Sequence, residues 1–170
     1  KIFLETNIMG TFNLLQASLE IKKILPSFIF HHVSTDEVYG DLDFHDPRFT
    51  ESSSYKPSSP YSASKASSDL LVQSWARTYD LNFIITNCSN NFGARQHTEK
   101  LIPTVIRKIL SNKKIPIYGN GLNIRDWIFA QDHAQAIISI HEHGLINERI
   151  NVGGDHEISN LSLVKHILKM

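Results

Sequence analysis

Residues 28–40 read FIFHHVSTDEVYG, and residues 57–69 read PSSPYSASKASSD. The first stretch begins as a short apolar run, which is typical of a buried β-strand, and polar side chains follow where the run ends. The second stretch begins with a Ser-Pro start signal, so we predict a helix over residues 61–79. A strand followed by a helix is the repeating unit of a parallel sheet that is covered by helices.

The same alternation continues on both sides of these stretches. Residues 41–60 are rich in Asp, Ser and Pro, and they predict a loop. Apolar spacing elsewhere predicts helices over residues 3–23, 99–110, 131–143 and 161–168, and strands over residues 82–86, 115–118 and 150–152. The chain therefore has the pattern of an α/β fold.

The composition excludes several classes of protein. Of the 170 residues, 41% are hydrophobic and 20% are charged, as in an ordinary soluble globular protein. The formal net charge is zero, so no overall field draws the chain to nucleic acid or to an anionic membrane. The apolar runs are shorter than the roughly 20 residues of a membrane span. Cys88 is the only cysteine, which excludes an intramolecular disulfide and favours a reducing compartment. The nine histidines match no common ligand spacing, so we expect no metal site.

Tyr61 and Lys65 are four residues apart, which places both side chains on one face of the predicted helix. A nearby ammonium favours the phenolate and should lower the pKa of Tyr61 from its ordinary value of about 10. The pair can then take a proton from a hydroxyl as a hydride leaves the same carbon. Taken alone, the spacing favours the plainer interpretation of a tyrosine that is half in the core and a solvated lysine.

Thr35, Asp36 and Glu37 follow directly after the first strand, at the edge of an open α/β sheet where ligands bind. Adjacent carboxylates repel each other, so their pKa values move apart and one can remain protonated as an acid. An elimination of water needs this division between an acid and a base. Taken alone, the pair also fits a solvated turn after a strand.

Four stretches carry a resemblance to a known family. Residues 31–41, 57–69, 86–91 and 124–127 are similar to segments of the dTDP-glucose 4,6-dehydratases, which belong to the extended short-chain dehydrogenase/reductase superfamily. Epimerases of that superfamily usually lack the acidic pair, and GDP-mannose dehydratases have Ser-Glu in its place. The resemblance implies a partial Rossmann-like, doubly wound parallel sheet with parts of a smaller substrate-binding subdomain.

The resemblance also implies roles for the matching residues. Tyr61 is the base for the sugar hydroxyl, and Lys65 holds the nicotinamide ribose of NAD. Asp36 is the acid and Glu37 the base of the elimination, and Thr35 hydrogen-bonds the sugar. The implied cofactor-binding residues are Thr6, Tyr61, Lys65 and Asn91. The implied substrate-binding residues are Thr35, Asn90, Lys100, Leu101, Pro116, Ile117, Tyr118, Arg125 and Asn160.

The implied reaction converts dTDP-glucose to dTDP-4-keto-6-deoxyglucose with loss of water, by means of bound NAD+. Arg125 would face the diphosphate, a bidentate task that suits a guanidinium group; without the resemblance, a surface ion pair with Asp126 is as good an interpretation. The resemblance further implies a cytoplasmic homodimer that pairs through the helices over residues 3–23 and 61–79.

No G-x-x-G-x-x-G phosphate-binding loop occurs in the sequence, although such a turn binds the pyrophosphate of a dinucleotide. We therefore expect the chain to be the central part of such an enzyme, and inactive by itself. Residues 1–92 are predicted to be the C-terminal half of the NAD-binding domain. Residues 93–170 are predicted to mix elements of that domain with nucleotide-sugar-binding elements, without an independent linker.

Two alternatives remain open at this point. The chain fits another nucleotide-sugar enzyme, such as an epimerase or a decarboxylase, although Asp36-Glu37 argues against one. It also fits a catalytically silent, truncated domain that only binds a partner or a substrate. The residues do not distinguish thymine from uracil in the nucleotide.

Overall fold

The computed structural model describes residues 1–43 and 45–170. These residues form two compact units that interleave along the chain. The first unit contains residues 1–88 and 138–152, and the second contains residues 89–137 and 153–170. The predicted functional division at residue 92 stays a prediction.

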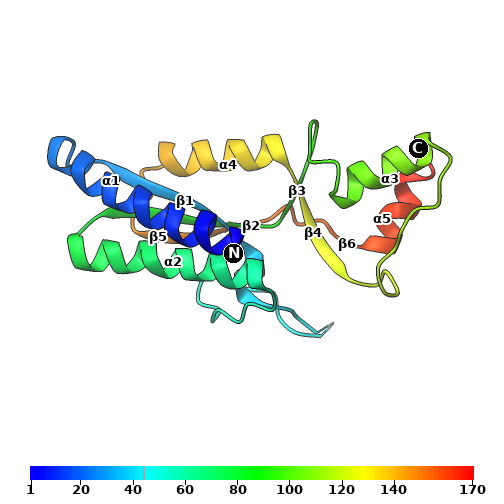
Figure 1. Ribbon diagram of the computed structural model, residues 1–170, viewed down its shortest axis with the longest axis horizontal. Coiled ribbons are helices and arrows are strands. Elements are labelled where there is room, and N and C mark those ends of the chain that lie inside the picture. Colours follow the sequence, from blue (N-terminus) through cyan, green and yellow to red (C-terminus); the bar gives the residue numbers. More distant parts are fainter. Residues whose placement is uncertain (44) are drawn as a thin grey trace. The chain divides into compact units, whose positions relative to one another are not determined.

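A three-stranded parallel sheet forms the centre of the first unit (Figure 1). Its strands lie in the order β1, β2, β5 and span Ile29–Thr35, Asn82–Cys88 and Glu148–Val152. Ile84 and Ile85 of β2 are fully buried, because this central strand has a neighbour on each side and side chains against both faces.

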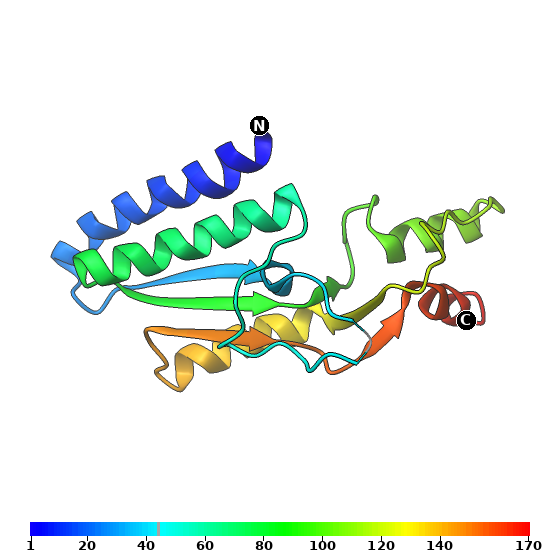
Figure 2. The ribbon, with the colours of Figure 1, turned by 90° about the horizontal axis from the view of Figure 1, so that it is seen from below.

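Two helices, α1 (Gly10–Ile24) and α2 (Pro60–Tyr79), lie side by side over one face of this sheet (Figure 2). A π-helical segment, η1 (Leu4–Met9), leads into α1. The side chain of Ser59 caps α2 and accepts a hydrogen bond from the backbone of Ser62, and Pro60 occupies the first helical position. The helices and the sheet enclose a core of Leu15, Val72, Leu81 and Ile85.

The second unit contains a sheet with the strand order β3 (Asn90–Phe92), β4 (Ile124–Phe129) and β6 (Glu157–Ser159). β3 runs parallel to β4, and β6 runs antiparallel to it. The helices α3 (Leu101–Leu110) and α5 (Asn160–Ile167) belong to this unit, and α4 (Ala130–Glu142) spans the division between the units. Within the described residues, no helix is long and apolar enough to cross a membrane.

The predicted α/β class, the parallel sheet and the helices that cover it are confirmed. Pro103 is the third residue of α3, where the first turn tolerates it. The loop over residues 41–60 is also found, except that Pro60 already belongs to α2. Residue 44 of this loop lies outside the described residues.

The strand predicted over residues 115–118 is wrong. Residues 116–118 are exposed, and strand propensity has no effect without a partner strand to pair with. Three strands that the apolar pattern did not predict are β3, β4 and β6. Two of them have only three residues, which is too short for any periodicity to be visible.

Candidate active site

The carboxyl end of β1 places the predicted acidic pair. Thr35 ends the strand, and the short 3₁₀ helix η2 (Asp36–Tyr39) begins directly after it. The Thr35 hydroxyl accepts the backbone N–H of Glu37 at 3.3 Å and donates to Oδ1 of Asp36 at 3.3 Å. Thr35 is therefore both the N-cap of η2 and a direct partner of the first carboxylate.

The environments of the two carboxylates differ. Asp36 is half-buried beside Thr35, whereas Glu37 is exposed. A sharp turn follows at Gly40, whose φ of 98° and close approach to the Lys56 carbonyl leave no room for a Cβ. This turn sends the chain away from the sheet and leaves Glu37 at the surface of the unit.

The N-terminal turns of α2 bring Tyr61 and Lys65 to the same edge of the sheet. Tyr61 is 37% exposed, and its ring packs edge-on against Phe3 at 5.6 Å between centroids. The Lys65 ammonium donates to the carbonyl oxygen of Val33 in β1 at 2.8 Å. The helix therefore holds its two polar groups beside the last residues of β1.

The pKa of Tyr61 is shifted in the direction opposite to the prediction. Burial raises it, and the negative charges of Glu37, Cys88 and Asp36 raise it further. Burial lowers the pKa of Lys65, although Asp69 and Cys88 act against this shift. The prediction considered only the ammonium and left out desolvation and the nearby carboxylates. The same shift also indicates that Tyr61, Asp36 and Glu37 share one electrostatic environment.

The sequence analysis missed a group of buried polar residues beneath this site. Asp69 is fully buried in α2, and its Oδ2 accepts from the Tyr55 hydroxyl at 3.0 Å and the Asn87 amide at 3.2 Å. The Nε2 atom of His32 lies 3.3 Å from the other carboxylate oxygen, Oδ1. The visible signal was Asp69 itself, one turn after Lys65 on a face that is otherwise apolar or small.

Most of the predicted nucleotide-side residues lie in the second unit. Asn90 and Asn91 are half-buried in β3, and the Asn91 side chain contacts the His133 ring at 2.9 Å and donates to the Ser89 carbonyl at 3.1 Å. Burial lowers the pKa of His133. Thr6 belongs to the first unit and is exposed in η1. The remaining residues are Lys100, Leu101, Pro116, Ile117, Tyr118, Arg125 and Asn160, which are exposed or half-buried.

Arg125 and Asp126 have separate partners. The Asp126 carboxylate accepts the backbone N–H groups of Gly154 and His156, each at 2.7 Å. Burial raises the pKa of Asp126, but these hydrogen bonds outweigh it, and the pKa lies below its ordinary value. Arg125 is exposed and donates to the Ile124 carbonyl at 3.4 Å. Asp126 thus anchors the turn after β5, and the guanidinium stays accessible to a ligand.

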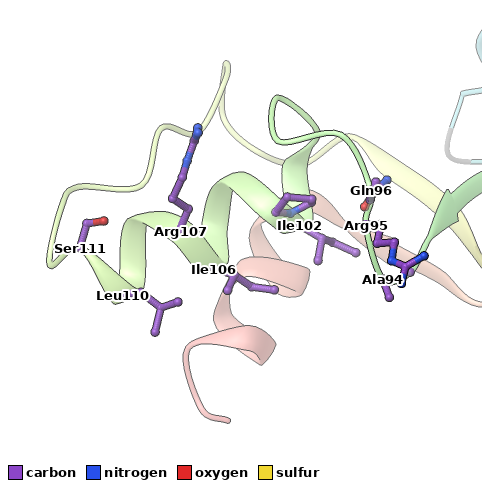
Figure 3. Close-up of a pocket in the computed structure, with 10 residues that line it drawn as sticks. Ala94, Arg95, Gln96, Ile102, Ile106, Arg107, Leu110 and Ser111 are labelled. Carbon is purple, nitrogen blue, oxygen red and sulfur yellow. The ribbon is translucent and has the colours of Figure 1, made fainter.

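A cavity of about 580 Å³ lies elsewhere in the second unit, between α3 and the segment Gly93–Gln96 (Figure 3). Ile102, Ile106 and Leu110 line it from α3, and Arg95 lies opposite (Figure 3). Of the described residues that line this cavity, none is a predicted site residue. This cavity therefore does not coincide with the predicted catalytic residues.

The whole chain, residues 1–170, matches the family model described as GDP-mannose 4,6 dehydratase. A dTDP-glucose 4,6-dehydratase from Neisseria meningitidis is 53% identical over 97% of this chain and 48% of its own length. The chain thus spans about half the length of this curated relative.

Two solved structures extend the comparison. A dTDP-glucose 4,6-dehydratase from Streptomyces venezuelae, solved with NAD bound, has a TM-score of 0.92 and 41% identity over 99% of this chain and 51% of its own. A UDP-glucuronic acid 4-epimerase from Bacillus cereus has a TM-score of 0.86 and 26% identity over 98% of this chain and 52% of its own. The predicted Rossmann-like fold is confirmed by both.

Proposed function

Since the chain belongs to the GDP-mannose 4,6 dehydratase family, we propose that the protein is an NAD-dependent lyase that converts dTDP-glucose to dTDP-4-keto-6-deoxyglucose. The observation that carries the proposal is the joint placement of an acidic pair, Asp36-Glu37, and a basic pair, Tyr61-Lys65, at one sheet edge. Oxidation at C4 needs Tyr61 and Lys65, and elimination of water needs Asp36 and Glu37.

The side chains at this edge fit the nicotinamide ribose of NAD. An ammonium has three N–H donors, and within the described residues Lys65 directs one of them to Val33. Two donors remain for two adjacent hydroxyls. The Ser34 hydroxyl is buried at the same strand end and has no hydrogen-bond partner in the part of the chain that is described. When bound, NAD+ would supply the acceptor for the hydride of C4 and the source of the hydride that C6 receives.

Tyr61 would remove the proton of the C4 hydroxyl as C4 becomes a carbonyl. The ring packs edge-on against Phe3, which restricts the positions of the phenol oxygen. Its raised pKa makes Tyr61 a strong base once it is deprotonated. The ammonium of Lys65, one turn further along α2, would offset part of that negative charge.

Glu37 and Asp36 would divide the loss of water. The new carbonyl at C4 acidifies the C5 proton, which Glu37 removes as the exposed, solvated carboxylate. The half-buried Asp36 gives a proton to the C6 hydroxyl, which leaves as water. Glu37 then returns a proton to C5 as C6 receives a hydride. Thr35 hydrogen-bonds Asp36 and so fixes the direction from which that proton comes.

Arg125 would bind the diphosphate of the nucleotide, and the half-buried Asn160 would complete the same pocket. Asn90 would contact the sugar, and Asn91 and Thr6 the dinucleotide. The base would lie against Lys100, Leu101, Pro116, Ile117 and Tyr118.

An epimerase is the second candidate, because the Bacillus cereus epimerase shares the fold. Asp36-Glu37 argues against it, since an epimerase moves hydrogen at C4 and needs no acid for a leaving hydroxyl. A catalytically silent binding domain is the third candidate. Such a domain would not need the hydrogen bonds that orient Asp36 and Lys65.

Product analysis tests the proposal. The full-length protein is incubated with dTDP-glucose and NAD+ in deuterated water, and the sugar is examined by NMR. We expect a 4-keto-6-deoxy sugar with one solvent deuterium at C5, because Glu37 exchanges that proton. A 4-epimer that retains its C6 hydroxyl, or no product at all, would contradict the proposal.

We also propose a cytoplasmic homodimer that pairs through α1 and α2. Both helices expose large apolar side chains, including Leu14, Ile21 and Leu70. Such side chains are typical of the buried centre of a dimer face. Sedimentation of the full-length protein should show a dimer, and Leu70→Glu should shift it to a monomer; sedimentation as a monomer before the substitution would contradict this proposal.

A further inference from the structure

The buried polar network beneath the site has one member that touches both halves of the catalytic machinery. The Nδ2 of Asn87, in β2, donates to the backbone carbonyl of Thr35 at 3.1 Å and to Asp69 Oδ2 at 3.2 Å. Thr35 is the N-cap of the turn that carries Asp36 and Glu37. Asp69 lies in the helix that carries Tyr61 and Lys65. The side-chain amide of Asn87 therefore connects η2, hereafter the acidic turn, to the helix α2.

A second contact ties Asn87 to the other end of the acidic turn. Its Oδ1 accepts from the Tyr39 hydroxyl at 3.3 Å, and Tyr39 is the last residue of η2. The Tyr39 hydroxyl also lies 2.8 Å from Oδ1 of Asn151 in β5. Asn87 thus contacts the turn at both of its ends, and the two carboxylates lie between these contacts.

The hydrogen-bonded residues Asp69, Asn87 and Tyr39 are buried, and their donors keep their protons. Asp69 is 0% exposed, Asn87 1% and Tyr39 2%. Burial raises the pKa of Tyr39 to about 12, so its hydroxyl keeps its proton at every physiological pH. A buried amide whose groups are all paired has no alternative arrangement that does not leave a polar atom unpaired.

We propose that Asn87 is a positioning residue that fixes the distance between the oxidising pair, Tyr61-Lys65, and the eliminating pair, Asp36-Glu37. This inference rests on the proposed function. Lys65 is held independently by Val33, so loss of the Asn87 contacts leaves the oxidation geometry in place. Asn87 holds the Thr35 end of the turn through the Thr35 carbonyl, whereas the Tyr39 end also has Asn151 as a partner. The same loss therefore releases the Thr35 end and displaces the two carboxylates that follow it.

The test is a split between the two chemical steps in the full-length protein. Asn87→Ser shortens the side chain and breaks both contacts to the turn. We expect C4 oxidation to continue near its original rate while elimination slows by about 10²-fold, the usual cost of misplacing a catalytic group by about 1 Å. Mass spectrometry of the quenched nucleotide should then show a 4-keto-glucose intermediate that retains its C6 hydroxyl.

Tyr55→Phe is the matched control. It removes a hydrogen bond to the same Asp69 oxygen but leaves Asn87 and the turn untouched. It should accumulate no intermediate. An equal slowing of both steps in Asn87→Ser, or the same accumulation in Tyr55→Phe, would show that the network is only structural. If Asn87→Ser does not fold, Tyr39→Phe is the second variant, because it releases the Tyr39 end of the turn from both Asn87 and Asn151, and it should accumulate the same intermediate.

A second readout does not depend on the reaction. Asn87→Ser and Tyr39→Phe remove partners of one hydrogen bond, so their destabilisations in urea unfolding should be less than additive in the double variant. Additive losses would overturn the connection between Asn87 and the turn. If the unfolding losses are non-additive and the unmodified protein makes no 4-keto-6-deoxy sugar, the connection stands and the proposed function fails.

Discussion

The two units of the molecule differ in how their predicted site residues are held. In the first unit, Thr35 is 9% exposed, and Lys65 and the acidic turn each have a hydrogen-bonded partner within the unit. In the second unit, Tyr118 is 86% exposed, and Arg125 is exposed and donates to the carbonyl of the adjacent Ile124. Proton transfer requires fixed atoms, whereas nucleotide binding can order its residues as the ligand arrives. Variants in the first unit should therefore change rates, and variants in the second should change affinities.

The largest effect is expected for Tyr61→Phe in the full-length protein. The substitution keeps the ring that packs against Phe3, so the fold should survive. Loss of a general base typically costs about 10²–10⁴ in rate, and the C4 ketone should not form. Single-turnover mass spectrometry of the sugar measures this step.

Tyr79→Phe, at the exposed C-terminal end of α2, is the control and should be neutral. Near-normal turnover by Tyr61→Phe would show that another group is the base. The assignment of the oxidation step to residues of the first unit would then be wrong.

A smaller effect is expected for Arg125→Ala in the second unit. Hydrogen bonds to charged groups contribute about 1.5–3 kcal/mol, so KM for the nucleotide sugar should rise by roughly 10- to 100-fold with little change in kcat. Arg125→Lys should recover only part of the loss, because an ammonium cannot form the bidentate fork.

Arg107→Ala removes another exposed arginine of the same unit and should leave KM unchanged. A large fall in kcat for Arg125→Ala, with KM preserved, would break the division between rates and affinities.

The smallest effect concerns pH. The proposed base, Tyr61, would act only when deprotonated, and its pKa is raised, so the rate of C4 oxidation should increase with pH throughout the neutral range. Glu37→Gln removes a negative charge that raises this pKa, so the same increase should occur at lower pH.

Glu20→Gln, which removes a carboxylate paired with Lys23, should not move the profile. A profile that shifts to higher pH in Glu37→Gln would contradict the electrostatic link between the two residues.

The sequence predicted the first unit better than the second, for physical reasons. β1 and α2 are continuous, strongly patterned elements, and Tyr61, Lys65 and Asp36 lie within or directly beside them. In the second unit, β3 and β6 have three residues each and exist because β4 pairs with them. Pairing between distant segments leaves no local pattern.

The direction of the Tyr61 pKa shift and the contacts of Asn87 were not predicted, for a related reason. Desolvation depends on the whole surroundings of a side chain, and the Asn87 contacts join residues that are 18, 48 and 52 positions apart. The roles of Asn90, Lys100 and Asn160 rest on resemblance, because their residue types alone indicate no chemistry.

The central claim is that oxidation and elimination use separate pairs of residues in the first unit. The most direct measurement follows the nucleotide sugar in Glu37→Gln and Asp36→Asn full-length protein with NAD+ in deuterated water. Both variants should accumulate a 4-keto-glucose nucleotide, and C5 exchange should be slow in Glu37→Gln but persist in Asp36→Asn. Rapid C5 exchange in Glu37→Gln, or blocked oxidation in both variants, would contradict the account and leave the acidic pair with a structural role only.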